Sequence, residues 1–275
     1  MSKKFFLLFF FGNLLFAFFL FGESDRIFDE QFHFKTYDIP LGDAILMKTP
    51  HGKFVTIDGG DDSTFVSKLS QDLPFWNREI ELMVVTHPEK DHFVGALESL
   101  KVYSVKNVFL TGANGKTSEF REFLSLLSEK DIPVFFSDSE KDFWIDGVFF
   151  DIFSPEKPLM GKEIQKMNNS GIVLRVTFED QSILLTADIE ADGEKEILKK
   201  PVPLKSDILK VAHHGSKTSS SPEFLEAVQP KISVISAGKK NPYGHPHAEI
   251  VDRIKNFGSG VLVTKDVGDI EFTLE

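Results

Sequence analysis

Residues 82–92 constrain the fold and the chemistry of this chain more than any other segment. An apolar run, Leu82 to Val85, leads through Thr86 into four potential metal ligands in close succession: His87, Glu89, Asp91 and His92. A ligand-rich loop fixed to the end of a buried strand can hold imidazoles and carboxylates in place before a metal arrives. A solvated polar turn is the alternative, but this density of ligand types favours a metal site.

Three further strand-like segments end in the same kinds of residue. Each is rich in β-branched and aliphatic side chains and leads into a carboxylate or a pair of imidazoles. The segments are residues 55–57 before Asp58, 183–186 before Asp188, and 208–212 before His213 and His214.

Six of the eight histidines lie in three clusters. The third cluster, His245 and His247, stands in a loop rich in glycine and proline ahead of a predicted helix. The other two, His33 and His51, are predicted to be structural or solvated.

The composition excludes several classes of site. The chain has no cysteine, so it can form no disulfide scaffold, thiol nucleophile, iron–sulfur cluster or zinc finger. A metal site must therefore use imidazole and carboxylate. The net charge of −11 predicts a poor nucleic-acid surface, unless bound divalent metals reverse the charge locally.

The N-terminal segment, residues 1–22, resembles an export signal. Two lysines precede Phe5–Phe21, a run that carries no charge, and nine of the 29 phenylalanines fall there. No Ala-x-Ala cleavage signature follows. We predict a signal peptide at residues 1–22, hence a periplasmic or extracellular protein, with an uncleaved membrane anchor or a buried N-terminal helix as alternatives. Residues 23–275 are predicted to form one domain.

Short strands and helices alternate along that domain, and the pattern predicts an α/β (α+β) fold of two packed sheets with helices outside. Strands are expected at residues 32–37, 44–48, 54–57, 82–85, 108–110, 148–153, 172–178, 183–186, 208–212, 232–236, 261–264 and 270–273. Helices are expected at residues 63–69, 94–100, 118–130, 193–199, 222–228 and 248–257.

These motifs, in this order and spacing, resemble the metallo-β-lactamase fold and, within it, the hydrolase domain of the ComEC-like competence family and its stand-alone relatives. The resemblance covers nearly all of residues 32–274. Its pieces are residues 38–44, 57–60, 86–92, 168–170, 185–188, 210–219 and 243–247. It implies a four-layer αββα sandwich with two divalent metal ions at the mouth between the sheets.

The resemblance also assigns roles to single residues. His87 and Glu89 would hold the first metal, while Asp91, His92 and His214 would hold the second. Asp188 would bridge the two ions. The choice of His214 over His213 rests only on its place before glycine.

The remaining site residues would surround the metals. An outer shell that orients the ligands would contain Asp58, Asn168, Asn169 and Ser170. The mouth that contacts the substrate would be lined by His213, Ser216, Lys217, His245 and His247.

Two departures from the wider fold bear on the metals. Glu89 stands where the wider fold has histidine, and Asn168-Asn169-Ser170 replace a further expected histidine, as in the ComEC-like group. The oxygen-rich first site favours manganese or a labile zinc. Leu41 replaces a glutamine of the ComEC-like pattern, so a polar group near the mouth is expected to be missing.

The implied mechanism is hydrolysis by a metal-bound hydroxide, with Asp91 at the catalytic centre. His245 or His247 would donate a proton to the leaving oxygen, aided by His213 at the mouth. As an alternative, both residues only pack at the entry to a helix.

Residues 108–117 resemble a nucleotide-binding loop in composition but lack the glycine spacing of one. Two residues separate Gly112 from Gly115, whereas a P-loop has four between its glycines. We therefore predict no nucleotide cofactor.

Three functions remain open from the sequence. An exported phosphodiesterase, with nucleic acid as the first candidate substrate, leads. A small-ester hydrolase of the phosphorylcholine esterase or lactonase type would use the same metals. A non-catalytic binding module with a degraded metal site is the third, motivated by Glu89 and the Asn168 region.

Overall fold

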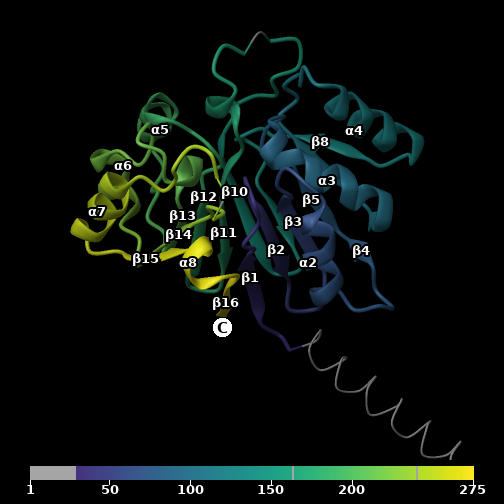
Figure 1. Ribbon diagram of the computed structural model, residues 1–275, viewed down its shortest axis with the longest axis horizontal. Coiled ribbons are helices and arrows are strands. Elements are labelled where there is room, and N and C mark those ends of the chain that lie inside the picture. Colours follow the sequence, from purple (N-terminus) through teal and green to yellow (C-terminus); the bar gives the residue numbers. More distant parts are fainter. Residues whose placement is uncertain (1–28, 163, 240) are drawn as a thin grey trace, which may run out of the picture.

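The structure, a computed structural model, describes residues 29–162, 164–239 and 241–275. Two seven-stranded sheets pack face to face, with α2, α3 and α4 outside the first and α5, α6 and α7 outside the second (Figure 1). The predicted αββα sandwich is therefore confirmed. The predicted signal peptide or anchor at residues 1–22 lies outside the described residues.

The first sheet has the strand order β16-β1-β2-β3-β5-β7-β8. Its strands are β16 (Ile270–Leu274), β1 (Phe32–Thr36), β2 (Ala44–Lys48), β3 (Phe54–Asp58), β5 (Leu82–Val84), β7 (Val108–Leu110) and β8 (Val134–Phe136). It is covered by α2 (Thr64–Asp72), α3 (Lys90–Val102) and α4 (Ser118–Glu129), and a two-stranded ribbon, β4 (Glu79–Ile80) with β6 (Ser104–Val105), lies beside it.

The second sheet has the order β15-β14-β13-β12-β11-β10-β9. Its strands are β15 (Gly260–Val263), β14 (Ile232–Ile235), β13 (Ile208–Lys210), β12 (Gln181–Leu185), β11 (Val173–Phe178), β10 (Val148–Ser154) and β9 (Phe143–Ile145). It is covered by α5 (Ala191–Leu198), α6 (Pro222–Val228) and α7 (Ala248–Asn256), and the short α8 (Thr264–Val267) precedes β16.

The strands that carry candidate ligands are parallel within each sheet. β3 pairs parallel with β5, and β12 pairs parallel with β13. Their carboxyl ends therefore meet at one edge of the sandwich, where α/β proteins commonly place their ligands.

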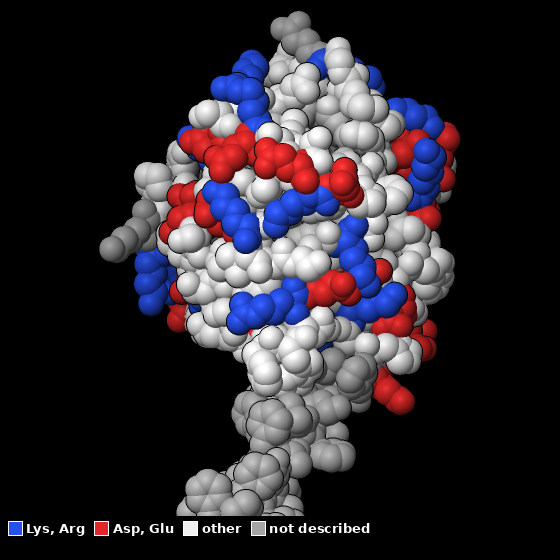
Figure 2. All heavy atoms as spheres, turned by 90° about the vertical axis from the view of Figure 1, so that its right-hand side faces the viewer, with Lys and Arg blue, Asp and Glu red and all other residues white. Residues whose placement is uncertain are grey.

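The outer flank formed by α3 and α4 carries charges of both signs. Figure 2 shows lysines and acids interspersed on this side of the molecule. One such pair, Lys101 with Glu122 at 2.9 Å, joins the two helices. Exposed pairs of this kind contribute about 0–1 kcal/mol each, so they keep the surface soluble more than they hold it together.

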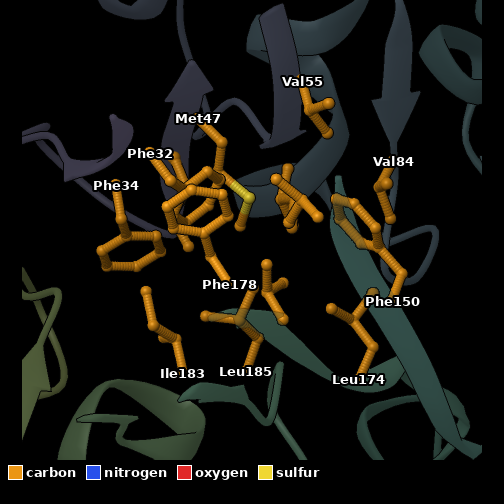
Figure 3. Close-up of a cluster of buried hydrophobic side chains, with 14 of the residues drawn as sticks. Phe32, Phe34, Met47, Val55, Val84, Phe150, Leu174, Phe178, Ile183 and Leu185 are labelled. Carbon is orange, nitrogen blue, oxygen red and sulfur yellow. The ribbon is translucent and has the colours of Figure 1, made fainter. Parts of the chain in front are cut away.

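The main core lies between the two sheets (Figure 3). Phe32 and Phe34 on β1 point inward in the two-residue period of a strand and belong to the same buried cluster as Phe150 and Phe178 from the second sheet, with the rings of Phe32 and Phe178 6.0 Å apart. All four are buried, and burying a phenylalanine contributes about 1.5–3 kcal/mol. Most phenylalanines outside the N-terminal segment are buried in the core.

The twelve predicted strands and six predicted helices are all present, with ends that shift by a few residues. Ser221 caps α6: its hydroxyl accepts a hydrogen bond from the Phe224 amide at 3.3 Å. The sequence analysis missed β4, β6, β8, β9 and α8, each of which is very short. So short a segment shows neither the alternation of a strand nor the period of a helix. None of the helices in the described ranges has the length and apolar character needed to cross a membrane.

Two glycines set the distance between the turn after β3 and helix α3. A Cβ on Gly95 would lie 1.9 Å from the Gly59 carbonyl oxygen, and the Gly95 amide donates to the Gly60 carbonyl at 3.0 Å. Only glycine allows this approach. The contact holds the first turn of α3, and with it Asp91 and His92, against β3.

Gly95→Ala should therefore lower the free energy of unfolding by about 1–3 kcal/mol, because the new methyl group forces the helix away from the turn. Urea unfolding measures the change. Gly260→Ala is the matched control, since a Cβ there meets no atom closer than 3.6 Å. Equal stability of the two variants would contradict the role given to Gly95.

Candidate metal centre

The candidate site lies at the edge where β3, β5, β12 and β13 end. The backbone is left-handed at Asp58, Ala187, His213 and His214, with φ of 57°, 45°, 50° and 53°. Such conformations cost non-glycine residues on the order of 1–3 kcal/mol each and persist where the surrounding structure enforces them. Their concentration at the ends of these strands is consistent with a functional site.

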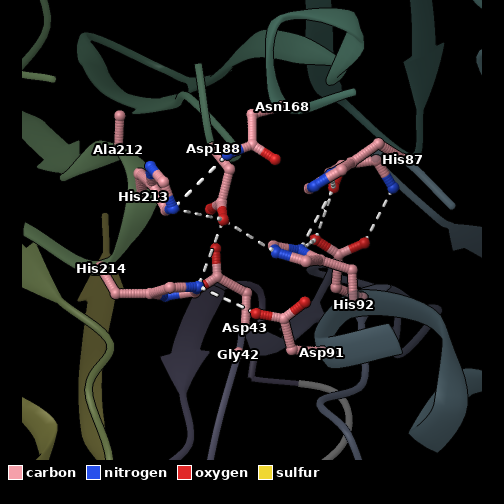
Figure 4. A network of polar contacts seen from close by, with 12 residues as sticks. Gly42, Asp43, His87, Asp91, His92, Asn168, Asp188, Ala212, His213 and His214 are labelled. Atoms are coloured by element: carbon pink, nitrogen blue, oxygen red, sulfur yellow. Dashed lines mark hydrogen bonds and ion pairs between the residues drawn. The ribbon is translucent and has the colours of Figure 1, made fainter. Parts of the chain in front are cut away.

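Four side chains from both sheets converge there (Figure 4). Ligand atoms of Asp91, His92, Asp188 and His214 all lie within 4.8 Å of one another. We call these residues the group of four. Asp188 Oδ2 is 3.3 Å from Nε2 of both His92 and His214, and His214 Nε2 is 3.6 Å from Asp91 Oδ2. Ligands about 2.0–2.1 Å from a tetrahedral metal ion lie about 3.3–3.4 Å apart, so these separations fit one coordination shell.

Buried polar atoms of this group make no hydrogen bond within the described residues. They are Nε2 of His92, Nε2 of His214 and Oδ1 of Asp188. Buried polar groups are normally satisfied, so atoms that converge without partners indicate a ligand. The donor set of two imidazoles and two carboxylates suits a divalent cation.

His92 is held from the side opposite Asp188. Its Nδ1 lies 2.8 Å from Asp58 Oδ2, and Asp58 also accepts hydrogen bonds from the amide and the hydroxyl of Thr86 at 2.8 and 2.7 Å. A carboxylate behind a ligand imidazole fixes the ring so that the far nitrogen faces the metal. Asp58 thus lies directly behind the His92 ring.

His214 is held by a second set of contacts that the sequence analysis missed. Its Nδ1 lies 3.1 Å from the Ser236 carbonyl oxygen and 3.3 Å from Asp43 Oδ1. Asp43 in turn forms an ion pair with Lys210 at 2.8 Å, and neither side chain is more than 3% exposed. A lysine inside the apolar run 208–212 was the sequence signal for this pair, because a buried lysine needs a partner.

The charges within the group of four support one another. Burial alone would lower the pKa of His92 and of His214, but nearby carboxylates, Asp188 first, raise the pKa of both rings well above the usual range. Burial would raise the pKa of Asp188, yet His214 and His92 hold that pKa well below its usual range. Without metal, protons on the histidines thus balance the buried carboxylates.

The two predicted ligands of the first metal lie outside the group of four. His87 is buried with its ring 4.1 Å from that of His92, its Nε2 has no hydrogen-bond partner in the described chain, and burial lowers its pKa to about 3. Glu89 is exposed, directly before α3. The structure therefore brings together the predicted ligands of the second metal more completely than those of the first.

His213 lies beside the group of four rather than in it. Its Nε2 is 3.9 Å from Asp188 Oδ2, and its ring contacts Asn168 Nδ2 at 3.4 Å and Thr218 Oγ1 at 3.2 Å. Of the two adjacent histidines, the geometry therefore brings His214 to the candidate metal position.

Two of the predicted outer-shell residues support the loops and not the ligands. The Asn169 side-chain oxygen accepts from the Glu190 amide at 2.7 Å, and the Ser170 hydroxyl donates to the Met167 carbonyl at 2.6 Å. Asn169 ties its loop to the segment that follows Asp188, and Ser170 closes a turn within that loop.

The predicted mouth residues form a histidine cluster next to His214. The His245 ring is 5.6 Å from that of His213, 5.0 Å from that of His247 and 6.3 Å from that of His214. Burial and the neighbouring imidazoles lower the pKa of His245 to about 4, so this ring is neutral near pH 7.

One glycine ties this cluster to the metal-site loop. Gly215 has a φ of 79°, a Cβ there would lie 2.6 Å from Pro246 Cβ, and its carbonyl accepts from the His247 amide at 3.0 Å. His247 Nδ1 accepts from the Lys217 amide at 3.2 Å, and the Ser216 hydroxyl lies 3.1 Å from that of Thr218. The Lys217 side chain is exposed.

The Gly-Lys-Thr segment that imitates a nucleotide-binding loop has a structural role. Thr117 Oγ1 accepts from the Phe120 amide at 3.2 Å and caps α4. A Cβ on Gly115 would lie 2.5 Å from the Phe120 ring, so this glycine permits the turn into the helix.

The sequence profile of the metallo-beta-lactamase superfamily matches residues 41–239. The chain belongs to this superfamily. ComE operon protein 3 of Bacillus subtilis is 30% identical over 254 residues, which cover 86% of this chain and 32% of that protein. Competence protein ComA of Neisseria gonorrhoeae is 27% identical over 271 residues, which cover 95% of this chain and 35% of that protein. The chain spans about a third of the length of these relatives, and the predicted ComEC-like resemblance is confirmed.

Solved structures agree on the fold. The metallo-beta-lactamase fold protein YhfI from Bacillus subtilis matches with a TM-score of 0.61 and 13% identity, over 88% of this chain and 99% of that one. CmlA, a diiron beta-hydroxylase from Streptomyces venezuelae, matches with a TM-score of 0.55 and 14% identity. The match covers 90% of this chain and 54% of that one. At these identities the likeness shows the fold alone.

Lys210→Met should lower the free energy of unfolding by about 3–5 kcal/mol, because it leaves the Asp43 carboxylate buried without its cation. The double variant Asp43→Asn/Lys210→Met should lose less than the single one, since no unpaired charge remains. Urea unfolding measures both. Lys231→Met, which removes an exposed pair with Asp207, should change stability by only about 0–1 kcal/mol. A double variant less stable than Lys210→Met would contradict this account.

Metal affinity should rise with pH through the neutral range. Because the pKa of His92 and of His214 is raised, a metal ion must displace protons from both rings. The metal-free protein should show the opposite trend. A histidine whose pKa rises on folding adds stability that is complete below the unfolded pKa of about 6.5 and is lost as pH rises through the folded value. Zinc competition titrations, and urea unfolding with a chelator, measure the two slopes; an affinity independent of pH would contradict the assignment.

Proposed function

We propose that this protein is a metal-dependent hydrolase that cleaves phosphodiester bonds. The observation that carries the proposal is the group of four: its ligand atoms converge from both sheets, and three of its buried polar atoms make no hydrogen bond within the described residues. Membership of the metallo-beta-lactamase superfamily, which suggests a metal-dependent hydrolase, supports the same reading.

We further propose two divalent ions, zinc or manganese. Asp91, His92, Asp188 and His214 would hold one, while His87 and Glu89, with Asp188 shared, would hold the other. Ions held there supply Lewis-acid chemistry, which activates water as a nucleophile and stabilises negative charge on ester oxygens. Asp58 and Asp43 would keep His92 and His214 oriented through their Nδ1 atoms.

The histidine cluster at the mouth would bind the substrate and assist the leaving group. Because His247 Nδ1 accepts from the Lys217 amide, its Nε2 carries the hydrogen and can donate a hydrogen bond to a leaving oxygen. His245, whose lowered pKa keeps its ring neutral near pH 7, likewise suits a hydrogen bond to the substrate.

Nucleic acid is the substrate class we favour, because competence proteins are among the relatives. The net charge of −11 opposes a long polyanion, so contact would be confined to the metal centre and its mouth. A small ester, such as a phosphorylcholine ester or a lactone, would avoid that repulsion. We propose export as well, on the pattern of two lysines and an uncharged apolar run within residues 1–22.

A binding module without catalysis is the second candidate. The exposure of Glu89 favours it, because a carboxylate in solvent holds a metal less firmly than the buried ligands of the group of four. Such a module would bind one ion and turn over no substrate.

Hydrolysis of bis-p-nitrophenyl phosphate with added manganese or zinc tests the proposal. Asp91→Ala and Asp188→Ala should each lower kcat/KM at least about 100-fold, because each removes a metal ligand. His51→Ala, which removes an exposed histidine paired with Asp146 far from the site, should leave the rate unchanged. If the protein binds metal but hydrolyses no substrate, the binding module is supported. If it binds no metal, both proposed functions are contradicted. Comparing the rates at which the protein hydrolyses single-stranded DNA and phosphorylcholine esters then separates the two substrate classes.

A further inference from the structure

Both tryptophans of the chain lie on the surface. Trp76, in the loop between α2 and β4, is 41% exposed and packs edge to face on Phe75 with ring centroids 4.7 Å apart. Trp144, on the edge strand β9, is 68% exposed. Its ring packs on that of Phe149, with centroids 4.8 Å apart. Tryptophan is a large amphipathic side chain, enriched at interfaces where one part of the ring is in an apolar environment and the other is in water.

The two tryptophans and the start of β1 occupy one end of the sandwich, opposite the metal centre. Asp29, just before β1, and Pro74, in the same loop as Trp76, line one cavity on the outer face of the first sheet. Figure 1 shows the loop between α2 and β4 beside the start of β1. Asp146, which follows β9, bonds Thr49 and His51 in the turn between β2 and β3 at this same end.

The charged side chains at this end largely neutralise one another. Lys106 lies 2.7 Å from Glu79 and 3.2 Å from Glu81, and Lys35 lies 2.9 Å from Asp72. The flank in Figure 2 likewise mixes both signs. Because its charges are paired, a surface of this kind attracts a charged partner only weakly at long range. Contacts of this end with a partner would therefore be made mainly by the tryptophans.

The chain that precedes β1 points to the partner. Phe5–Phe21 contain no charge, and the short connection formed by residues 22–28 can span at most about 25 Å when fully extended. If the apolar segment is retained and lies in a bilayer, the start of β1 must stay within that distance of the lipid. Trp76 and Trp144 are then the side chains at the facing end, and tryptophan is enriched where protein meets the membrane–water interface.

We propose that this end of the domain rests on a lipid bilayer, with Trp76 and Trp144 in the interfacial region. The proposal takes residues 1–22 as an uncleaved anchor and does not depend on the reaction at the metal centre. It directs the metal centre and the histidine cluster away from the lipid, into the aqueous phase.

Quenching of tryptophan emission by brominated lipid tests the contact. The full-length chain would be reconstituted in phosphatidylcholine vesicles with and without bromine on the acyl chains. W144F leaves Trp76 as the single tryptophan, and W76F leaves Trp144. The control W76F/W144F/Y243W places one tryptophan beside His245, at the opposite end, where Tyr243 is 62% exposed.

Emission from Trp76 and from Trp144 should fall roughly twofold in the brominated vesicles, and that of the control should stay unchanged. The quenching should persist at high salt, because apolar contact is not screened. The proposal is overturned if the protein floats with the vesicles but neither native tryptophan is quenched, if the control is quenched equally, or if the full chain does not bind vesicles. None of these measurements depends on hydrolysis. Failure of the membrane proposal therefore leaves the proposed function intact, and failure of the proposed function leaves the membrane proposal intact.

Discussion

The buried ion pair of Asp43 and Lys210 is the interaction on which the architecture of the site depends. Asp43 stands at the start of β2 in the first sheet, and Lys210 ends β13 in the second. The attraction within a buried ion pair offsets the desolvation of its charges only when the geometry is good. Removing one partner nevertheless destabilises the protein strongly, because it leaves the other charge buried and unpaired. The pair therefore fixes how the two sheets meet directly beneath His214. The Ser236 hydroxyl, which donates to the Gly42 carbonyl at 2.8 Å, adds a second bridge at the same level.

Close backbone contacts then place the loops on this frame. The Asp43 amide donates to the Asp91 carbonyl at 3.2 Å, and the Ile172 amide donates to the Thr86 carbonyl at 3.0 Å. Both hydrogen bonds act on the segment that follows β5, one from within the first sheet and one from the second. The candidate ligands Asp91 and His92 thus lie on backbone that is held from two sides, which is what a preorganised site requires.

The sequence predicted the fold well because its signals were local and repeated. Buried strands that end in ligand residues, such as 82–85 before His87, show their role without knowledge of the tertiary structure. The sequence also indicated Asp58 behind the ligands through the family resemblance. Lys210, inside an apolar run, indicated that a buried cation needs a partner, but the sequence could not identify that partner as Asp43, because the two residues are far apart along the chain and only the packing of the sheets joins them. The exposure of Glu89 was equally hidden, since it depends on how the chain enters α3.

The division of the group of four between the two sheets has a consequence for the order of assembly. Asp91 and His92 come from the first half of the chain, whereas Asp188 and His214 come from the second. A nascent chain must extend as far as His214 before it contains all four, and their ligand atoms converge only once β12 and β13 have docked. An ion held by the group of four would therefore be bound late in folding, after the two halves of the chain have come together.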